Sequence, residues 1–441
     1  MPEPLKHDTI IALSSGHGRA GVSVFRISGP NADAFLKAYC RGELPAPRQS
    51  SLRWIYTEEG DRVDQALILR FCAPASFSGE DLVELHTHGS PALAEEILRL
   101  ALRLDQYRLA EPGEFSRRAF ENGKLDLIQA EGIADVIDAV TTTQLKQAVR
   151  FVAGDASEKL TGWRSEILKA SAFLAASIDF SDEGDVGENP HAPVLGIIDS
   201  LIAEFDGALN DARQASRVRD GIRIAILGEP NVGKSTLMNA LAKRDAAIVS
   251  DIAGTTRDIL EVHLVIGGVP VTMADTAGLR DTDDPIEAEG VRRARAWAET
   301  ADLKLYLSVT GEQGNAPSEP VDLWIGTKVD QSGNDVSKFD MNVSAKTGQG
   351  LSELRARLSD EVRRLTGSDE PPSLVRARHQ SQISEAIDAL HKARQQLSDF
   401  DDVDLAAFEL SIARSALDRI VGRVDVEDIL GEVFSGFCVG K

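Results

Sequence analysis

The sequence predicts an α/β domain inserted into a discontinuous all-α domain, with an α+β domain in front. Two changes of hydrophobic pattern, and a return of helical spacing after residue 367, lead to this. Short apolar runs bounded by Gly, Pro and polar residues fill residues 1–122, and helical spacing of apolar residues follows. A continuous apolar run at 223–228, typical of a buried parallel strand, then starts the inserted domain. We therefore divide the chain into 1–122, a helical domain of 123–219 and 368–441, and an α/β domain of 220–367.

The N-terminal domain is expected to mix strands with helices. Its strands are predicted over residues 9–13, 22–28, 65–71 and 81–86. Long helices are predicted from residue 124, break at the loop-forming segment 181–193 and resume over 194–209. The C-terminal segment repeats the helical spacing, with apolar residues at Ile383, Ile387, Leu390, Leu417, Ile420 and Val424.

Composition limits the class of protein. A length of 441 residues favours two to four domains. The content of 42% apolar and 27% charged residues is that of a globular protein, and the absence of any 18-residue apolar run predicts a soluble chain without a membrane span. Seventy acidic against 48 basic residues give a net charge of −22, which argues against nonspecific coating of nucleic acid. Any RNA contact is expected to be local.

The cysteines and the first residues indicate the compartment. Cys40, Cys72 and Cys438 are too few and too scattered for a disulfide framework or a zinc site, so we expect free thiols in a reducing compartment. The first eight residues lack the basic and apolar regions of a secretory signal. We therefore expect a cytoplasmic protein.

A phosphate-binding loop is predicted at residues 228–235, GEPNVGKS, between a strand and a helix. In such a loop backbone N–H groups surround the phosphates, Lys234 reaches the β and γ oxygens, and the Ser235 hydroxyl ligates Mg²⁺. The alternative, a chance Gly-rich turn, does not explain the placement between strand and helix. Contacts to nucleotide are expected from Asn231, Val232, Gly233, Lys234, Ser235 and Thr236.

A second motif, DTAG at residues 275–278, follows the apolar run 269–274. It places the Asp275 carboxylate at the carboxyl end of a strand, toward the Mg²⁺ side, and the Gly278 N–H near the γ-phosphate. Alone it could be a tight turn, and the upstream loop favours the nucleotide. The adjoining Thr276 and Ala277 are included in the site, and Thr256 of GTTRD is the predicted second Mg²⁺ ligand.

The strand and loop at residues 321–330, VDLWIGTKVD, separate GTP from ATP. The Asp330 carboxylate can accept hydrogen bonds from guanine N1–H and N2–H₂, whereas adenine offers an acceptor at that edge. The Lys328 stem can lie over the base. Thr327 and the later segment Ser344, Ala345 and Lys346 complete the predicted pocket.

Two other patterns have weaker functional interpretations. Gly16, Gly18 and Gly21 match G-x-G-x-x-G, but a strand and not a helix is predicted to follow, so we reject a dinucleotide site. His86 and His88 could bind a metal, but no third ligand stands near them, which favours a structural role.

The order of the α+β region, helices, GEPNVGKS, DIAGTTRD, DTAGLR, helices and the terminal FCVGK resembles the MnmE/TrmE family of tRNA-modifying GTPases over essentially the whole chain. DIAGTTRD together with the C-terminal FCVGK is the specific part of the likeness. The resemblance implies an α/β P-loop GTPase domain inserted in an all-α helical domain, preceded by an N-terminal α+β folate-binding-like domain.

The family's activity is what the resemblance implies for this chain. With an FAD-containing partner of the MnmG/GidA type, the family installs an aminomethyl-type (carboxymethylaminomethyl) group at C5 of wobble uridine 34 of certain tRNAs. The carbon comes from a tetrahydrofolate derivative. The N-terminal domain is implied to form the homodimer and to bind folate through Arg26, Glu84, Lys124 and Lys441, which look like ordinary surface charges from the sequence alone.

The resemblance also fills a gap in the hydrolytic site. Leu279 follows DTAG where Ras-like GTPases carry a Gln that orients water, and no arginine finger is evident. The resemblance implies that Asn231, Ser250, Ile252 and Thr255 hold a K⁺ ion and that Glu287 orients the water. The alternative interpretation of Glu287 is a solvated carboxylate at the start of a helix. The remaining residues of this nucleotide-contacting loop are Asp251, Ala253 and Gly254.

The sequence departs from the family at two positions. Thr327 stands where N-K-x-D has Asn, which removes a side-chain amide that braces the base pocket, so weaker nucleotide affinity is expected. Ser250 replaces a common Thr, a mild change if its carbonyl is the K⁺ ligand.

Cys438 has three interpretations. It superficially resembles a prenylated cysteine, but Gly440 and Lys441 do not fit that motif. The others are a small buried hydrophobe and a reactive thiol, which we assign as catalytic in the modification chemistry.

Two functions remain in view. The first is an enzyme pair that modifies wobble uridine, and the FCVGK tail favours it. The second is a regulatory GTPase switch that binds RNA or ribosomal partners without covalent chemistry.

Overall fold

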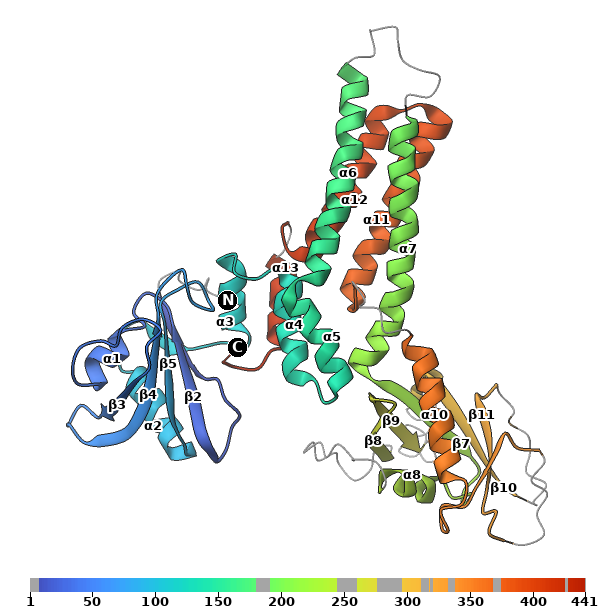
Figure 1. Cartoon of the computed structure of the whole chain (residues 1–441), viewed down its shortest axis with the longest axis horizontal. Helices are drawn as coiled ribbons and strands as arrows, with labels where there is room; N and C mark the ends of the chain where they lie inside the picture. Colours follow the sequence, from blue (N-terminus) through green and yellow to red (C-terminus); the bar gives the residue numbers. More distant parts are fainter. Residues whose placement is uncertain are drawn as a thin grey trace, which may run out of the picture. The chain divides into compact units, whose positions relative to one another are not determined.

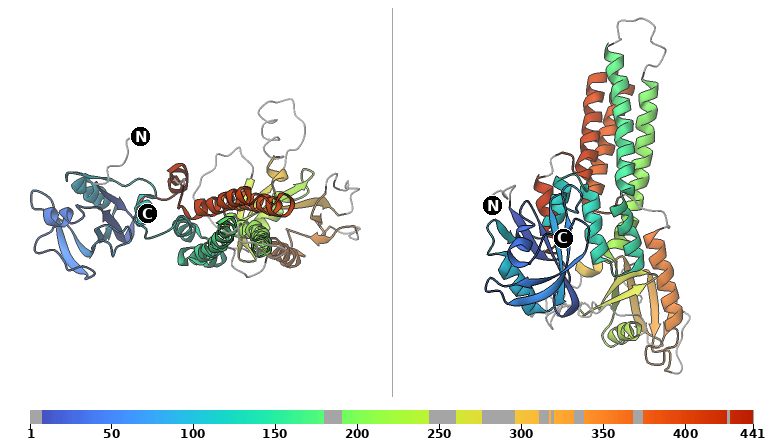
Figure 2. Two further views of the ribbon diagram at one scale, coloured as in Figure 1. Left: turned by 90° about the horizontal axis from the view of Figure 1, so that it is seen from above. Right: turned by 60° about the vertical axis from the view of Figure 1, so that its left-hand side comes forward.

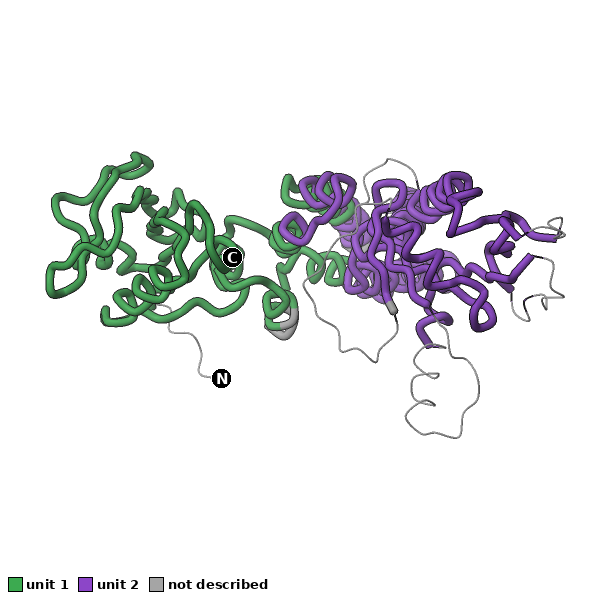
Figure 3. Tube along the Cα trace, turned by 90° about the horizontal axis from the view of Figure 1, so that it is seen from below, with its two compact units in different colours: residues 1–134, 151–164, 414–441 green, residues 135–150, 165–413 purple. Residues whose placement is uncertain are grey.

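The structure, a computed structural model, describes residues 8–179, 191–243, 260–275, 296–310, 317, 320–331, 338–367, 374–424 and 427–440 (Figures 1 and 2). Its contacts divide the chain into two compact units, coloured separately in Figure 3. Unit 1 comprises residues 1–134, 151–164 and 414–441, and unit 2 comprises 135–150 and 165–413. Four of the described helices pass from one unit into the other along the chain: α4 (Leu127–Asp138), α5 (Thr142–Ala153), α6 (Asp155–Asp179) and α12 (Val403–Val421).

A six-stranded mixed sheet forms the N-terminal part of unit 1. Its order is β3-β4-β5-β2-β1-β6, with β1 and β6 parallel and the other pairs antiparallel. One face packs on apolar residues of two helices, including Phe35 and Leu100, and Phe115 of a third helix packs on the other face. The strands are β1 (Thr9–Leu13), β2 (Ala20–Ser28), β3 (Ser51–Tyr56), β4 (Arg62–Phe71), β5 (Leu82–Gly89) and β6 (Tyr107–Leu109), and the helices are α1 (Ala34–Tyr39), α2 (Pro91–Ala101) and α3 (Glu114–Glu121).

The end of the chain belongs to the same unit as its beginning. Helix α13 (Glu427–Ser435) buries Leu430 and Phe434 against Leu127 and Ala130 of α4, and Phe437 joins this cluster. Apolar residues at helical spacing on both segments explain the contact. The C-terminal residues are thereby tied to the start of the helical region.

Helices from before and after the inserted domain pack together in unit 2. Helix α7 (Ala192–Asp220) lies along α11 (Ala377–Gln395), and their buried faces carry Ile198, Phe205, Ile383 and Leu390 (Figures 1 and 2). The short α5 (Thr142–Ala153) and a π-helical turn, η1 (Gln396–Phe400), complete this helical region. The helical domain is therefore discontinuous in sequence, as predicted.

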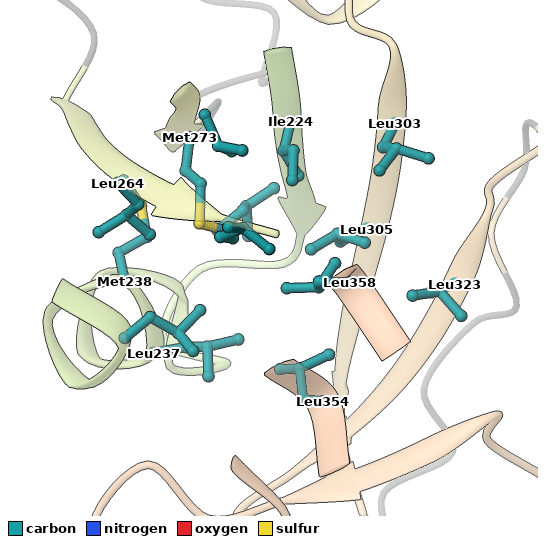
Figure 4. Close-up of a cluster of buried hydrophobic side chains, with 14 of the residues drawn as sticks. Ile224, Leu237, Met238, Leu264, Met273, Leu303, Leu305, Leu323, Leu354 and Leu358 are labelled. Atoms are coloured by element: carbon teal, nitrogen blue, oxygen red, sulfur yellow. The ribbon is translucent and has the colours of Figure 1, made fainter. Parts of the chain in front are cut away.

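The inserted domain is a doubly wound α/β sheet in the order β12-β11-β10-β7-β9-β8. All neighbouring strands are parallel except β8 and β9. Figure 4 shows its core, where Ile224, Leu305 and Leu358 are fully buried. The elements are β7 (Ile222–Gly228), α8 (Lys234–Ala242), β8 (Leu260–Ile266), β9 (Val269–Asp275), β10 (Leu303–Val309), β11 (Leu323–Thr327), β12 (Met341–Val343) and α10 (Leu351–Thr366).

One carboxylate holds both connections of the insertion. Asp135 Oδ1 accepts from Arg219 Nε at 2.9 Å, one residue before α7 ends, and from Arg376 Nη2 at 2.8 Å, one residue before α11 begins. The side chain of Asp135 is 17% exposed. The entry and exit of the α/β domain are thus anchored at a single point on α4.

Most predicted elements that lie in the described residues are confirmed, and the differences are at the ends of helices. The helical spacing was extended to Val424, but α12 ends at Val421 because Gly422 takes a φ of +83°. The predicted loop at 181–193 is mostly outside the described residues, and α7 begins inside it at Ala192. Across the described residues, every helix is too short or too polar to cross a bilayer.

Candidate functional site

The phosphate-binding loop follows the central strand β7. Gly228 has a φ of +134°, and a Cβ there would lie 2.3 Å from the Leu307 carbonyl oxygen of β10. Gly233, directly before α8, has a φ of +105°, and Asn231 adopts a φ of +64°. These conformations turn the chain from strand to helix and leave the first N–H groups of α8 open to an anion.

Lys234 points back into this loop. Its side chain is 4% exposed, and Nζ donates to the carbonyl oxygens of Gly228 at 2.7 Å and Glu229 at 3.1 Å. Burial lowers the pKa of the Lys234 ammonium, and Asp275, whose Oδ1 lies 4.0 Å away, opposes that shift. The ammonium is thereby held at the mouth of the loop, ready to exchange carbonyl partners for phosphate oxygens.

The two predicted motifs meet at Ser235 and Asp275. Strand β9 lies beside β7, with Asp275 level with Ile226, and Ser235 Oγ donates to Asp275 Oδ2 at 2.9 Å. A hydroxyl and a carboxylate side by side supply the hard oxygen ligands that Mg²⁺ takes. The residues present therefore fit a Mg²⁺ ion bound through Ser235, with Asp275 next to it.

The base end of the site lies two strands away on the same sheet edge. Strands β11 and β12 are parallel, so Asp330 and Ser344, which follow them, emerge together. A hydrogen bond from the Ser344 side chain lowers the pKa of the Asp330 carboxyl. The backbone N–H of Asp330 and the charge of Lys346 lower this pKa further. Asp330 is exposed and ionised, as an acceptor for guanine requires.

Thr327, the departure from the family pattern, has a brace of its own. Its side-chain Oγ1 lies 2.7 Å from the Val232 carbonyl oxygen and 3.2 Å from that of Ser308, both of which can accept its proton. The residue is buried. The Thr327 hydroxyl thus has a hydrogen bond to the phosphate loop, and the expected weaker nucleotide affinity stays a prediction.

Several predicted residues lie outside the described part of the chain, so their placement stays a prediction. These are Ser250, Asp251, Ile252, Ala253, Gly254, Thr255, Thr256, Thr276, Ala277, Gly278, Leu279, Glu287 and Lys441.

Arg26 and Glu84, predicted from the family likeness to bind folate, form a pair in unit 1. They face each other on β2 and β5, and Arg26 donates to Glu84 Oε1 from Nη2 at 2.9 Å and Nε at 3.2 Å. The guanidinium carbon lies 5.1 Å from the centre of the Phe77 ring. Phe77 lies in the loop between β4 and β5. Lys124 lies against this loop, since a Cβ on Gly79 would be 3.3 Å from Lys124 Cγ.

The C-terminal tail returns to this sheet. Val439 forms an antiparallel bridge with Pro112, and the Gly113 N–H donates to the Cys438 carbonyl at 3.4 Å. Gly440 packs on Leu13, the last residue of β1. Cys438 itself is an exposed free thiol, so the buried-hydrophobe interpretation is wrong. Cys40 and Cys72 are also free, as predicted.

The two histidines of β5 pair with different carboxylates. His86 Nε2 lies 3.4 Å from Glu84 Oε2, and His88 Nδ1 lies 2.8 Å from Asp64 Oδ1. Within the described ranges, no three His, Cys, Asp or Glu side chains gather in a way that could hold a metal.

The sequence did not predict that Thr310, which follows β10, supports the base-binding loop through the Thr327 carbonyl. Thr310 donates from both its backbone N–H and its hydroxyl to the Thr327 carbonyl, each at 3.1 Å. The available signal was a polar pair, Ser308 and Thr310, at the carboxyl end of the apolar run of β10.

A phosphate loop after the central strand, a hydrogen-bonded Ser235–Asp275 pair beside it and a carboxylate-bearing base loop on the same sheet edge define a P-loop GTPase. A family model described as the MnmE helical domain matches residues 127–438, and one described as the GTP-binding protein TrmE N-terminus matches 9–124. The chain belongs to the MnmE (TrmE) family.

Full-length relatives agree with this assignment. Proteins named tRNA modification GTPase MnmE from Hyphomonas neptunium, Caulobacter vibrioides and Parvibaculum lavamentivorans are 44%, 46% and 47% identical. The matches cover 98% of this chain and 99%, 100% and 100% of those proteins.

Two solved structures are also similar. Aquifex aeolicus Era bound to GDP·AlF4⁻ is 24% identical with a TM-score of 0.25, over 38% of this chain and 66% of Era. The G domain of the T. maritima FeoB iron transporter is 21% identical with a TM-score of 0.23, over 32% of this chain and 99% of that domain.

Proposed function

We propose that this GTPase works with an FAD-containing partner protein of the MnmG/GidA type to install an aminomethyl-type group at C5 of wobble uridine 34 of certain tRNAs. GTP hydrolysis drives a conformational cycle of the pair. The proposal is supported by membership of the MnmE family and by relatives whose names state tRNA modification. It places the reaction in the cytoplasm, with this chain as a homodimer.

The observation that carries the proposal is the position of the C-terminal tail. Gly440 packs on Leu13, and the residue before Leu13, Ala12, is paired with Arg26 on the next strand. The tail that bears Cys438 therefore runs along the part of the sheet that carries Arg26 and Glu84. In the proposal Arg26, Glu84, Lys124 and Lys441 bind a tetrahydrofolate derivative, which supplies the carbon.

Exchange of Cys438 for Ser tests the chemistry separately from GTP hydrolysis. Because Cys438 is exposed and the change nearly isosteric, Cys438→Ser should leave kcat for GTP and the melting temperature unchanged. Modified wobble uridine should disappear from tRNA of a deletion strain complemented with the variant, as measured by nucleoside mass spectrometry. Cys72→Ser, the other exposed thiol, is the matched control and should restore modification.

Normal modification with Cys438→Ser would remove that residue from the chemistry. If tRNA from the deletion strain contained the same wobble nucleosides as tRNA from the wild-type strain, a regulatory switch without covalent chemistry would be favoured. Co-purification of a yellow flavoprotein with the tagged chain is the corresponding test of the partner.

The hydrolytic site is proposed to need K⁺ and Mg²⁺. Ser235 and Thr256 hold Mg²⁺, Asn231 and the loop 250–255 hold K⁺, and Glu287 orients water. A bound cation would stabilise the negative charge that develops on the phosphates in the transition state. Where an arginine finger does this, it raises the rate on the order of 10³- to 10⁵-fold.

Replacement of K⁺ by Na⁺ at constant ionic strength should therefore slow GTP turnover strongly. Asn231→Ala should blunt the response to K⁺, whereas Asn239→Ala, an exposed Asn on the neighbouring helix α8, should respond like the parent. Equal turnover in the two salts would exclude a K⁺ role.

A further inference from the structure

The carboxylate of Glu84 divides its two oxygens between two side chains. Arg26 donates from both Nη2 and Nε to Oε1, at 2.9 and 3.2 Å, so both guanidinium bonds fall on the same oxygen. Among the described residues, the hydrogen-bond partner of Oε2 is His86, whose Nε2 lies 3.4 Å away. Oε2 is therefore the oxygen of this pair that keeps acceptor capacity for a ligand.

Arg26 holds Glu84 in place, whereas His86 can change the charge beside it. The guanidinium of Arg26 lies over the rings of Phe77 and Phe115, 5.1 and 5.8 Å from their centres. The side chains of Arg26, Glu84 and His86 are 22%, 16% and 28% exposed, so water reaches each of them only in part. An imidazole ordinarily gains or loses a proton between pH 5 and 8, so a charge can appear next to Oε2 in this range.

The neighbouring strands leave Glu84 as the polar partner of His86. Val24 on β2 and Leu67 on β4 are level with His86, and both are apolar. The other charged or titratable side chains of β4 and β5 have partners elsewhere: Asp64 with His88, Arg62 over the Trp54 ring and Arg70 with Asp33. A proton taken up by His86 therefore acts mainly on the Glu84 carboxylate.

We propose that His86 is a positioning residue that controls whether Oε2 of Glu84 is available to a ligand. The protonated imidazole holds this oxygen by a charge-assisted hydrogen bond, and the neutral imidazole holds it less strongly. The ligand is a tetrahydrofolate, whose pterin ring carries N–H groups that donate to a carboxylate oxygen. The inference rests on the proposed folate role of Arg26 and Glu84 and adds the group that regulates it.

The affinity for a reduced folate at two pH values tests this role. The probe is 5-formyltetrahydrofolate, titrated calorimetrically into the full-length chain at pH 5.5 and at pH 8. We expect the parent to bind about three- to fivefold more weakly at pH 5.5, the effect of one partly exposed ion pair that the ligand must displace. His86→Gln keeps an N–H donor but cannot gain a proton, so it should bind equally at both pH values.

His88→Gln is the matched control, because His88 lies on the same strand and pairs with a different carboxylate, that of Asp64. This variant should keep the pH dependence of the parent. Proton release is a second readout, which a merely structural role of His86 would not change. At pH 6, binding should release protons from the parent but not from His86→Gln, as measured by calorimetry in buffers of different ionisation enthalpy.

Equal pH dependence in the parent and in His86→Gln would overturn the inference. So would tighter binding by the parent at pH 5.5 than at pH 8, or the loss of pH dependence in His88→Gln. In each of these cases the probe still binds, and the folate role of Arg26 and Glu84 stands. A parent chain that binds no probe at either pH would contradict the folate role and the inference together, which distinguishes the two failures.

Discussion

The buried ammonium of Lys234 lies where a phosphate would bind, and its burial lowers the stability of the folded chain. Burial lowers its pKa, so the charged form is less stable in the folded chain than in the unfolded one. The resulting loss of stability is present at neutral pH and is relieved as the pH rises through the range where the ammonium loses its proton. Phosphate oxygens of a nucleotide would supply the missing opposite charge, so binding and stability are coupled at this residue.

Asp330 should decide which base is bound. Asp330→Asn replaces an acceptor by a donor opposite guanine N2–H₂, so GTP affinity should fall by about 10² or more, while xanthosine triphosphate, whose exocyclic oxygen accepts, should bind better. Because the pKa of Asp330 is lowered from its usual value, this residue should add no pH dependence to GTP binding between pH 5.5 and about 8. Competition titrations with both nucleotides measure the switch. A variant that binds GTP like the parent would show that the base lies elsewhere.

The sequence predicted which residues of the candidate site lie together better than it predicted how they are held. Lys234, Ser235 and Asp275 belong to local motifs whose chemistry requires them at fixed spacing, and the structure brings them together. The bracing by Thr327 joins residues 327 and 232, which are distant in sequence, so no local pattern contains it.

At the scale of elements, long and strongly patterned segments were predictable. Strands β1, β7 and β9 match their apolar runs within a residue. Strand β6 has three residues and pairs with the sheet through β1, and β3 carries polar residues on an edge. Neither has the periodicity that identifies a strand without its neighbours.

The C-terminal tail is an element fixed by backbone contacts. Gly440 has a φ of +96°, and a Cβ there would lie 2.6 Å from the Leu13 carbonyl oxygen. Gly440→Ala should therefore displace the tail at a cost of about 1–3 kcal/mol in local conformation. We expect unchanged GTP turnover and reduced wobble-uridine modification in the complemented strain.

Gly436→Ala is the matched control for the tail, because a Cβ at Gly436 meets only the Val433 carbonyl at 4.0 Å and its φ is not positive. Modification at the parent level in Gly440→Ala would mean that the position of the tail does not matter for the reaction.

At the scale of the molecule, the two connections of the inserted domain share one carboxylate, that of Asp135. Asp135→Asn removes the charge that pairs with both Arg219 and Arg376, and the partly exposed pairs should contribute about 1–2 kcal/mol together. We expect a lower melting temperature and faster hydrogen exchange at the end of α7 and the start of α11 at the same time.

Asp138→Asn is the control for this change, because Asp138 is exposed at the end of the same helix. Faster exchange at only one of the two connections would show that Asp135 does not couple them.

The packing of α7 on α11 fixes an order of events during synthesis on the ribosome. Helix α7 is complete at Asp220, but its partner begins at Ala377, so the whole α/β domain must be made before the two helices can meet. At 5–20 residues per second this interval lasts on the order of ten seconds, which is long compared with the folding of a small domain. The nascent α/β domain can therefore fold and take up guanine nucleotide while α7 still exposes its apolar face to the cell.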